Sequence, residues 1–379
     1  MINLTLVTED FVLTGGNYYF MEITNRLLRR GYNVKIVASR GSPWFYKNNK
    51  VPIIYPEEPK VLKYLSKILQ LKYKQIRDFK GLDYYLILSK LFNVDLDFSR
   101  IMTNIIPESD LIITGVPYAY LWSYTSRKFK KLAFFPQGWG GYIYFTSKSM
   151  RWYLTFYMPF DYYIALTQIE AKIAMSMRKD RNTKYFVVRA GVDTNLFTPK
   201  RKDSNAKVMV ILRSDRNKNP KLAIDALNLL SRKLNFTAII VHDGVLSKFK
   251  NDIHFKYEEN QRVPHEKMAE LYNEATVFLY TSRMESYGLP PLEAMACGTP
   301  VVTTDNIGGR EYLVHEGNAL VDKSFSPNVL SEYIYRVVRD DELRERLVRN
   351  GLETAKQHDW EIITDNWVKM LKEIEDEIK

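Results

Sequence analysis

The stretch LYTSRMESYGLPPLEAMACGTPVVTTDN, residues 279–306, decides the fold of this 379-residue chain. An apolar strand is followed by a Gly/Pro loop, a short helix that opens at Pro290 or Pro291, and a second strand at Val301–Thr303. Proline suits the first turn of a helix, and Gly298 marks the exit from it. The order of strand, helix and strand predicts a unit of a parallel α/β protein.

Two glutamates lie in this stretch, Glu285 in the loop and Glu293 in the helix. A helix that opens directly after a strand leaves free backbone N–H groups at the carboxyl edge of the sheet, where anions bind. An ionised glutamate only accepts hydrogen bonds, so its partners are hydroxyl groups such as those of a sugar or a ribose. Phosphates would bind the loop amides of Ser286, Tyr287, Gly288 and Leu289. These features predict a ligand with hydroxyls at both ends and phosphate in the middle, as in a nucleotide sugar.

The segment ESYGLPPLE, residues 285–293, resembles the signature of the retaining, nucleotide-sugar-dependent glycosyltransferases of GT-B architecture, the glycogen synthase and mannosyltransferase-like group. The resemblance implies that Glu285 holds a hydroxyl of the donor sugar and that Glu293 holds the ribose. It also implies an α/β fold of two Rossmann-like domains that face each other across a cleft. A solvated helix start with two surface glutamates is the alternative interpretation.

Two cations precede this motif in RSDRNKNP, between a predicted strand at Val208–Leu212 and a predicted helix at Lys221–Leu230. Arg213 and Lys218 resemble the pair with which the family neutralises the donor diphosphate. A departing nucleoside diphosphate needs positive charge where its own charge develops, so both are expected electrostatic catalysts. Two surface cations in a basic protein are the alternative.

The N-terminus predicts a βαβ unit whose first turn carries Gly15 and Gly16. In the family this glycine pair faces the donor phosphates and the acceptor, and a plain turn is the alternative. A second glycine-rich loop begins at Gln137, where many relatives have a histidine, and no histidine precedes His242. A catalytic histidine in the N-terminal half is therefore excluded.

The segment AGVDTNLFTP, residues 190–199, resembles the inter-domain segment of the family. We expect an acceptor domain over residues 1–200 and a donor domain over 201–360, with a C-terminal helix at about 361–379 that packs back on the first domain. One amphipathic helix is predicted at 327–350. Residues 251–264 occupy the position of the loop that holds the nucleotide base in the family.

The composition, with 46% hydrophobic and 26% charged residues, is ordinary for a soluble protein. No run of 18 apolar residues occurs, so we expect a cytoplasmic protein. Cys297 is the only cysteine, which excludes an internal disulfide and a zinc site built from cysteines. The histidines show no metal-ligand spacing, so neither a metal nor another cofactor is expected besides the nucleotide-sugar substrate.

The net charge of +11 favours anionic partners. Helical spacing over residues 59–77 places Lys60, Lys63, Lys67, Gln70, Lys74 and Arg77 on one face. Such a helix can lie on an anionic membrane surface, which would make the protein peripheral to the membrane and the acceptor lipid-linked. An ordinary solvated helix is the alternative, with a soluble glycan as acceptor.

Two other functions remain open. One is a sugar phosphorylase on the same scaffold, and the other is a non-catalytic protein that binds nucleic acid or an anionic surface. The lysines are spread along the chain and do not gather with aromatic residues in one module, so nucleic acid is not the expected partner. Retention of configuration rests on the resemblance alone, and the base, whether that of UDP or GDP, is not determined.

Overall fold

The computed structural model describes residues 2–11, 15–43, 46, 48–57, 97–137, 157–178, 182–200 and 206–379. They form two compact units, the first from residues 1–188 and 364–379 and the second from residues 189–363. The predicted basic helix at 59–77, and with it the expected membrane contact, lies outside the described residues.

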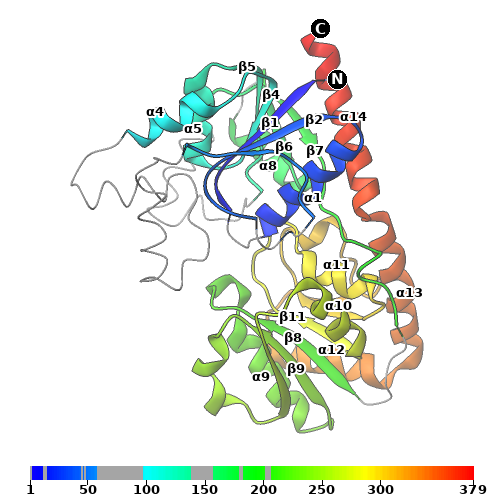
Figure 1. Cartoon of the computed structure of the whole chain (residues 1–379). Coiled ribbons are helices and arrows are strands. Elements are labelled where there is room, and N and C mark those ends of the chain that lie inside the picture. Colours follow the sequence, from blue (N-terminus) through cyan, green and yellow to red (C-terminus); the bar gives the residue numbers. More distant parts are fainter. Residues whose placement is uncertain are drawn as a thin grey trace, which may run out of the picture. The chain divides into compact units, whose positions relative to one another are not determined.

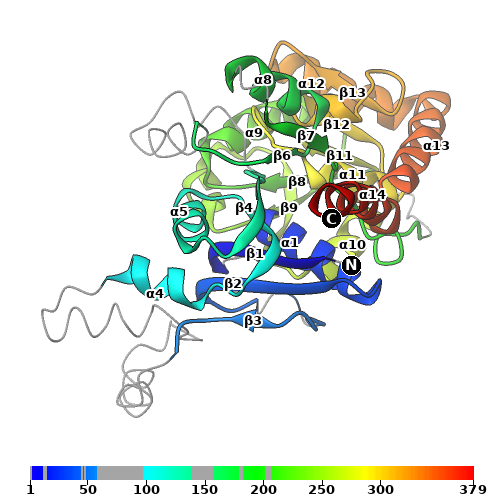
Figure 2. The ribbon, with the colours of Figure 1, turned by 90° about the horizontal axis from the view of Figure 1, so that it is seen from above.

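The described part of the first unit contains a seven-stranded parallel sheet with the strand order β3-β2-β1-β4-β5-β6-β7 (Figure 1). Figure 2 shows β3 beside β2 at one edge of this sheet. The strands are β1 (Asn3–Phe11), β2 (Asn33–Gly41), β3 (Ile53–Ile54), β4 (Ser109–Thr114), β5 (Phe129–Phe134), β6 (Tyr162–Ala165) and β7 (Lys184–Val187). The helices are α1 (Gly15–Arg29), α4 (Phe98–Ile105), α5 (Pro117–Ser126), α8 (Gln168–Arg178) and most of α14 (Trp360–Ile378).

Helices cover both faces of the first sheet because its strands are apolar on both sides. Met102 of α4, Tyr120 of α5 and Ala171 of α8 share one buried cluster with strand residues. On the other face Trp367 of α14 donates from Nε1 to the hydroxyl of Tyr19 in α1 at 2.7 Å. Both rings are buried, so this bond anchors α14 to the first unit.

The second unit contains a six-stranded parallel sheet with the order β10-β9-β8-β11-β12-β13 in its described residues. The strands are β8 (Lys207–Leu212), β9 (Thr237–His242), β10 (Lys256–Gln261), β11 (Val277–Tyr280), β12 (Val301–Thr304) and β13 (Ala319–Asp322). The α-helices are α9 (Pro220–Ser231), α10 (His265–Glu274), α11 (Leu289–Ala296), α12 (Pro327–Arg339) and α13 (Asp341–Gln357), and the 3-10 turns are η1 (Arg216–Lys218), η2 (Val245–Lys248), η3 (Lys250–Asp252) and η4 (Gly309–Glu311). Helices α9 and α12 pack together on one face, α10 and α11 cover the other, and α13 packs against α11 (Figure 1).

The signals of the 279–306 stretch are confirmed. Helix α11 begins at Leu289 with proline in its first turn, and Gly298 follows its end with φ of +65°. Strand β12 is one residue longer than predicted. A predicted α/β fold with two parallel sheets is therefore confirmed.

Three expectations differ from the structure. The single helix predicted at 327–350 is two helices, because the carboxylate of Asp340 caps the amide of Leu343 and starts α13 anew. The segment 251–264 contains strand β10, which pairs with β9. The units divide after Val188 and not near residue 200, because Val192 donates to the carbonyl of His358 at 2.9 Å and so joins the second unit.

None of the helices in the described ranges is both long enough and apolar enough to cross a membrane.

Candidate active site

The carboxyl ends of β8 and β11 place one predicted cation, Lys218, beside the first predicted glutamate, Glu285. The two strands are parallel neighbours, so the loops that follow them leave the sheet at the same edge. The amide of Arg283 donates to the carbonyl of Asn217 at 2.7 Å, and the Thr281 hydroxyl donates to the carbonyl of Lys218 at 3.1 Å. These bonds hold the two loops together over a separation of more than 60 residues.

Lys218, Glu285 and Tyr280 form the centre of the site. The ammonium group of Lys218 forms an ion pair with Oε1 of Glu285. The hydroxyl of Tyr280 donates to the same oxygen at 2.5 Å, and Lys218 Nζ lies 3.4 Å from that hydroxyl. The side chain of Glu285 is 12% exposed and that of Lys218 is 27% exposed. Both charged groups are thus partly sheltered yet accessible to a ligand.

The loop after Glu285 offers free amides at the start of α11. The amides of Ser286, Tyr287 and Gly288 donate to no other group in the described part of the chain. Gly288 has φ of +92°, a conformation that glycine adopts without strain, and it precedes the first helical residue. Consecutive free amides at a helix N-terminus form an anion-binding site.

A second loop, which includes η4, holds this first loop in place through hydrogen bonds to its carbonyl groups. The amide of Gly308 donates to the carbonyl of Glu285 at 3.1 Å, and the hydroxyl of Tyr312 donates to the carbonyl of Gly288. The ring of Tyr312 also stacks on that of Tyr287 with centroids 5.4 Å apart. The carbonyl groups on either side of the free amides are therefore both held.

Glu293 lies on α11, one helix turn into the same element. Its Oε2 accepts a hydrogen bond of 3.0 Å from the hydroxyl of Tyr272. Burial raises the pKa of Glu293, while the charges of His265 and Arg213 and the bond from Tyr272 lower it by less. The residue keeps part of its surface exposed, so a ligand hydroxyl can reach it.

Replacing Glu293 by glutamine is expected to raise the midpoint of thermal unfolding at about pH 8 and to leave it nearly unchanged at about pH 4. A carboxyl whose pKa is raised by folding costs stability above its unfolded-state pKa, and this cost vanishes at lower pH. Glutamine carries no charge and still accepts a bond from Tyr272. Scanning calorimetry at both pH values checks the expectation, with Glu332→Gln as the surface control. A gain of equal size at both pH values would contradict it.

Arg213 lies at the same edge of the sheet but outside the central cluster. It is exposed, and its charge acts on Glu293 and on Asp243. Asp243 accepts hydrogen bonds from both the amide and the hydroxyl of Ser214, at 3.0 and 2.8 Å. The structure therefore brings Lys218 to Glu285 directly and leaves the guanidinium of Arg213 facing solvent.

In the first unit the structure brings Gly16 next to Gln137. A Cβ atom on Gly16 would lie 2.5 Å from Oε1 of Gln137, whereas one on Gly15 would meet nothing within 4 Å. Gly16 therefore allows a close approach, and Gly15 is open at the start of α1. Nε2 of Gln137 is buried without a hydrogen-bond partner among the described residues.

Metal ligands do not gather in the part of the chain that the structure describes: no group of three or more His, Cys, Asp or Glu side chains there is able to hold an ion.

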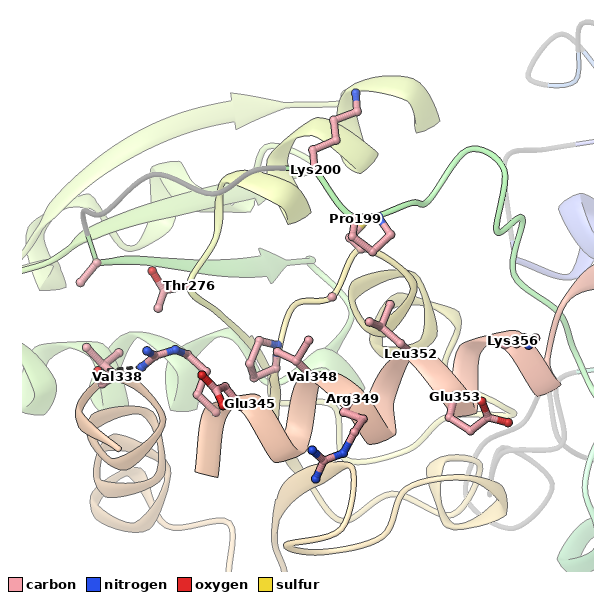
Figure 3. Close-up of a pocket in the computed structure, with 15 residues that line it drawn as sticks. Pro199, Lys200, Thr276, Val338, Glu345, Val348, Arg349, Leu352, Glu353 and Lys356 are labelled. Atoms are coloured by element: carbon pink, nitrogen blue, oxygen red, sulfur yellow. Dashed lines mark hydrogen bonds between the residues drawn. The ribbon is translucent and has the colours of Figure 1, made fainter. Parts of the chain in front are cut away.

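A cavity of about 880 Å³ in the second unit lies at the amino ends of the strands, opposite the carboxyl ends that carry the candidate active site (Figure 3). Thr276 and Pro300, which line it, stand immediately before β11 and β12, whereas Lys218 and Glu285 follow strands. Figure 3 shows Val348 and Leu352 of α13 turned toward Pro199. The cavity is thus separate from the candidate active site.

Sequence reasoning missed four residues of this site: Tyr272, Tyr280, Gly308 and Tyr312. Among them only Gly308 carries a local signal, because it opens the glycine pair of IGGRE at residues 307–311. The tyrosines stand in apolar or mixed segments, where an aromatic residue ordinarily indicates core packing. Only their hydroxyl contacts distinguish them.

Comparison with known proteins finds glycosyltransferases. Residues 192–354 match the family described as Glycosyl transferases group 1. An uncharacterized glycosyltransferase of Methanocaldococcus jannaschii is 29% identical over 164 residues, which cover 41% of this chain and 46% of the relative. The O-antigen chain mannosyltransferase B of Escherichia coli is 36% identical over 110 residues, 29% of this chain and 28% of the relative. The chain thus spans less than half the length of these two relatives.

A solved structure of the Anabaena protein HepE in complex with UDP-glucose matches this fold with a TM-score of 0.74 at 16% identity, over 98% of this chain and 100% of that chain. The two parallel α/β units are those of the GT-B architecture. The fold is therefore that of the GT-B glycosyltransferases, and residues 192–354 match the family of Glycosyl transferases group 1.

Proposed function

We propose that this protein transfers a sugar from a nucleotide-sugar donor to an acceptor hydroxyl, with retention at the anomeric carbon and without a required metal ion. The proposal rests on one arrangement in the second unit. Lys218, Glu285 and Tyr280 form a polar cluster beside the free amides at the start of α11. Cation, hydroxyl acceptor and anion-binding amides therefore lie together, as a nucleotide sugar requires.

Each group has a distinct task in the proposed reaction. The amides of Ser286–Leu289 and the ammonium group of Lys218 bind the diphosphate, with Arg213 as an additional cation. Their positive charge stabilises the negative charge that develops on the leaving nucleoside diphosphate. Glu285 accepts a hydrogen bond from a hydroxyl of the donor sugar, and Glu293 accepts one from the ribose.

Donor binding must rearrange the pair of Lys218 and Glu285. In the structure the two side chains form an ion pair and neutralise each other. When a diphosphate enters, its charge competes with the carboxylate for the ammonium group, and Glu285 becomes available to the sugar. The exchange replaces one ion pair by another, so neither charge is left unpaired in a partly sheltered site.

The acceptor is expected on the first unit, where Gly15, Gly16 and Gln137 lie at the carboxyl edge of the sheet. No histidine precedes His242 in the chain, so a histidine base from this unit has no part in the proposal. The buried amide nitrogen of Gln137 can donate a hydrogen bond to an oxygen of the acceptor substrate or of the nucleotide sugar. A soluble glycan and a lipid-linked glycan both remain as acceptor classes.

The test is calorimetric binding of UDP, GDP, ADP and their sugar conjugates in the presence of a chelator. UDP-glucose comes first because the HepE structure contains it, and GDP-mannose second because of the mannosyltransferase relative. We expect the wild-type protein to bind one nucleotide family and Glu293→Ala to bind it about 10-fold or more weakly. Glu332→Ala, an exposed residue on α12, is the control.

Three outcomes would overturn the proposal. The first is a wild-type protein that binds none of these nucleotides. The second is release of sugar phosphate from a glycan and inorganic phosphate, which would identify a phosphorylase. The third is salt-sensitive binding to DNA by a protein that ignores nucleotide sugars.

A further inference from the structure

Two buried tyrosines stand at the two ends of the segment that carries β11. Tyr272 lies near the end of α10 and is fully buried, and Tyr280 is the last residue of β11 and is 4% exposed. The hydroxyl of Tyr272 donates to Oε2 of Glu293 at 3.0 Å, and that of Tyr280 donates to Oε1 of Glu285 at 2.5 Å. Each glutamate of the candidate site thus has its own tyrosine.

Packing holds the two phenol rings in place. Phe278 lies between them, with its ring edge-on to Tyr272 at 5.2 Å and stacked on Tyr280 at 5.8 Å. Phe278 is itself fully buried in a central strand of the sheet. A tyrosine loses few rotamers when it is buried, so its hydroxyl is a well-defined hydrogen-bond donor.

Each tyrosine occupies one carboxylate oxygen and leaves the other open. Oε2 of Glu285 and Oε1 of Glu293 accept no hydrogen bond from any group that the structure describes. A glutamate side chain has three rotatable bonds, and a bond to one oxygen restricts all three. The open oxygen then has a defined direction in which it can accept a hydrogen bond from a ligand.

Burial keeps both tyrosines protonated. It raises the pKa of Tyr272 and of Tyr280 well above the ordinary value, and the neighbouring glutamate raises each further. Burial therefore favours the protonated form of both hydroxyls, which is the form that donates a hydrogen bond.

We propose that Tyr272 and Tyr280 are positioning residues of the donor site, one for each glutamate. Tyr272 orients Glu293 toward the ribose, and Tyr280 orients Glu285 toward the transferred sugar and keeps it there when Lys218 turns to the diphosphate. This inference rests on the proposed function. It adds that the nucleotide half and the sugar half of the donor are positioned through separate hydrogen bonds.

The test compares Tyr272→Phe with Tyr280→Phe by calorimetry, using the nucleoside diphosphate that the wild-type protein binds and its sugar conjugate. Each variant loses one hydroxyl and keeps the ring. Tyr272→Phe is expected to weaken the binding of both ligands by the same factor, about 3- to 10-fold. Tyr280→Phe is expected to leave the affinity for the nucleoside diphosphate unchanged. It is expected to weaken binding of the sugar conjugate only, and to lower kcat. Tyr335→Phe on α12, remote from the site, is the control.

Equal losses of affinity for both ligands in both variants would overturn the inference. Unchanged affinity together with a lower midpoint of thermal unfolding would also overturn it, because this result indicates a purely structural role. The wild-type measurement separates this inference from the proposed function. If the wild-type protein binds no nucleotide, the proposed function fails and the inference fails with it. If the wild-type protein binds and the two variants do not differ in ligand preference, only the inference fails.

Discussion

Glu285→Ala is expected to reduce sugar transfer by at least about 10²-fold while the protein remains folded. The substitution removes the acceptor of the Lys218 ammonium group and of the Tyr280 hydroxyl at once. On the proposed function, it removes the carboxylate that binds the donor sugar, and it leaves Lys218 without its ion-pair partner. Steady-state release of the nucleoside diphosphate in the presence of acceptor measures the loss.

Glu285→Gln separates geometry from charge. Glutamine retains an oxygen for the Tyr280 hydroxyl but forms no ion pair with Lys218. We expect its activity to lie between those of the wild-type protein and the alanine variant, and Lys218→Ala to resemble Glu285→Ala. A folded Glu285→Ala protein with wild-type turnover would remove Glu285 from the site. Loss of the folded state in both Glu285 variants would assign the residue a structural role.

Gly308→Ala is expected to abolish nucleotide binding and to lower the midpoint of thermal unfolding by about 5 °C or more. A Cβ atom at this position would lie 2.5 Å from the amide nitrogen of Tyr287 and 2.7 Å from the carbonyl oxygen of Glu285. These are backbone atoms of the loop that carries the free amides, so the whole loop must move. Differential scanning calorimetry and nucleotide titration measure the two effects.

Backbone conformation is not the reason for this effect. Gly308 has φ of −70° and ψ of −37°, which alanine adopts readily. The cost comes only from the close approach of two loops. Gly15→Ala is the stability control, because a Cβ there meets nothing within 4 Å. A Gly308→Ala protein as stable as Gly15→Ala, with normal nucleotide affinity, would show that the two loops can separate freely.

Local patterns in the sequence predicted the elements of the second unit. Proline lacks an amide hydrogen and so marks the start of the helix, at residues 290 and 291. Glycine tolerates positive φ and so marks its end, at residue 298. These effects act within one turn of the chain. The same reasoning joined residues 327–350 into one helix, because the amphipathic pattern continues through Asp340 and only the capping bond to Leu343 reveals the break.

The sequence by itself determined the parallel α/β class, the helix that carries Glu293 and the positions of both motif glutamates, since each depends on residues a few positions apart. Only the tertiary structure decided which groups meet these glutamates. Lys218 lies 67 residues from Glu285, and Tyr272 lies 21 residues from Glu293. Lys218 meets Glu285 because the neighbouring parallel strands β8 and β11 end at one edge of the sheet, and Tyr272 meets Glu293 because α10 packs against α11. Both strand order and helix packing are properties of the folded chain.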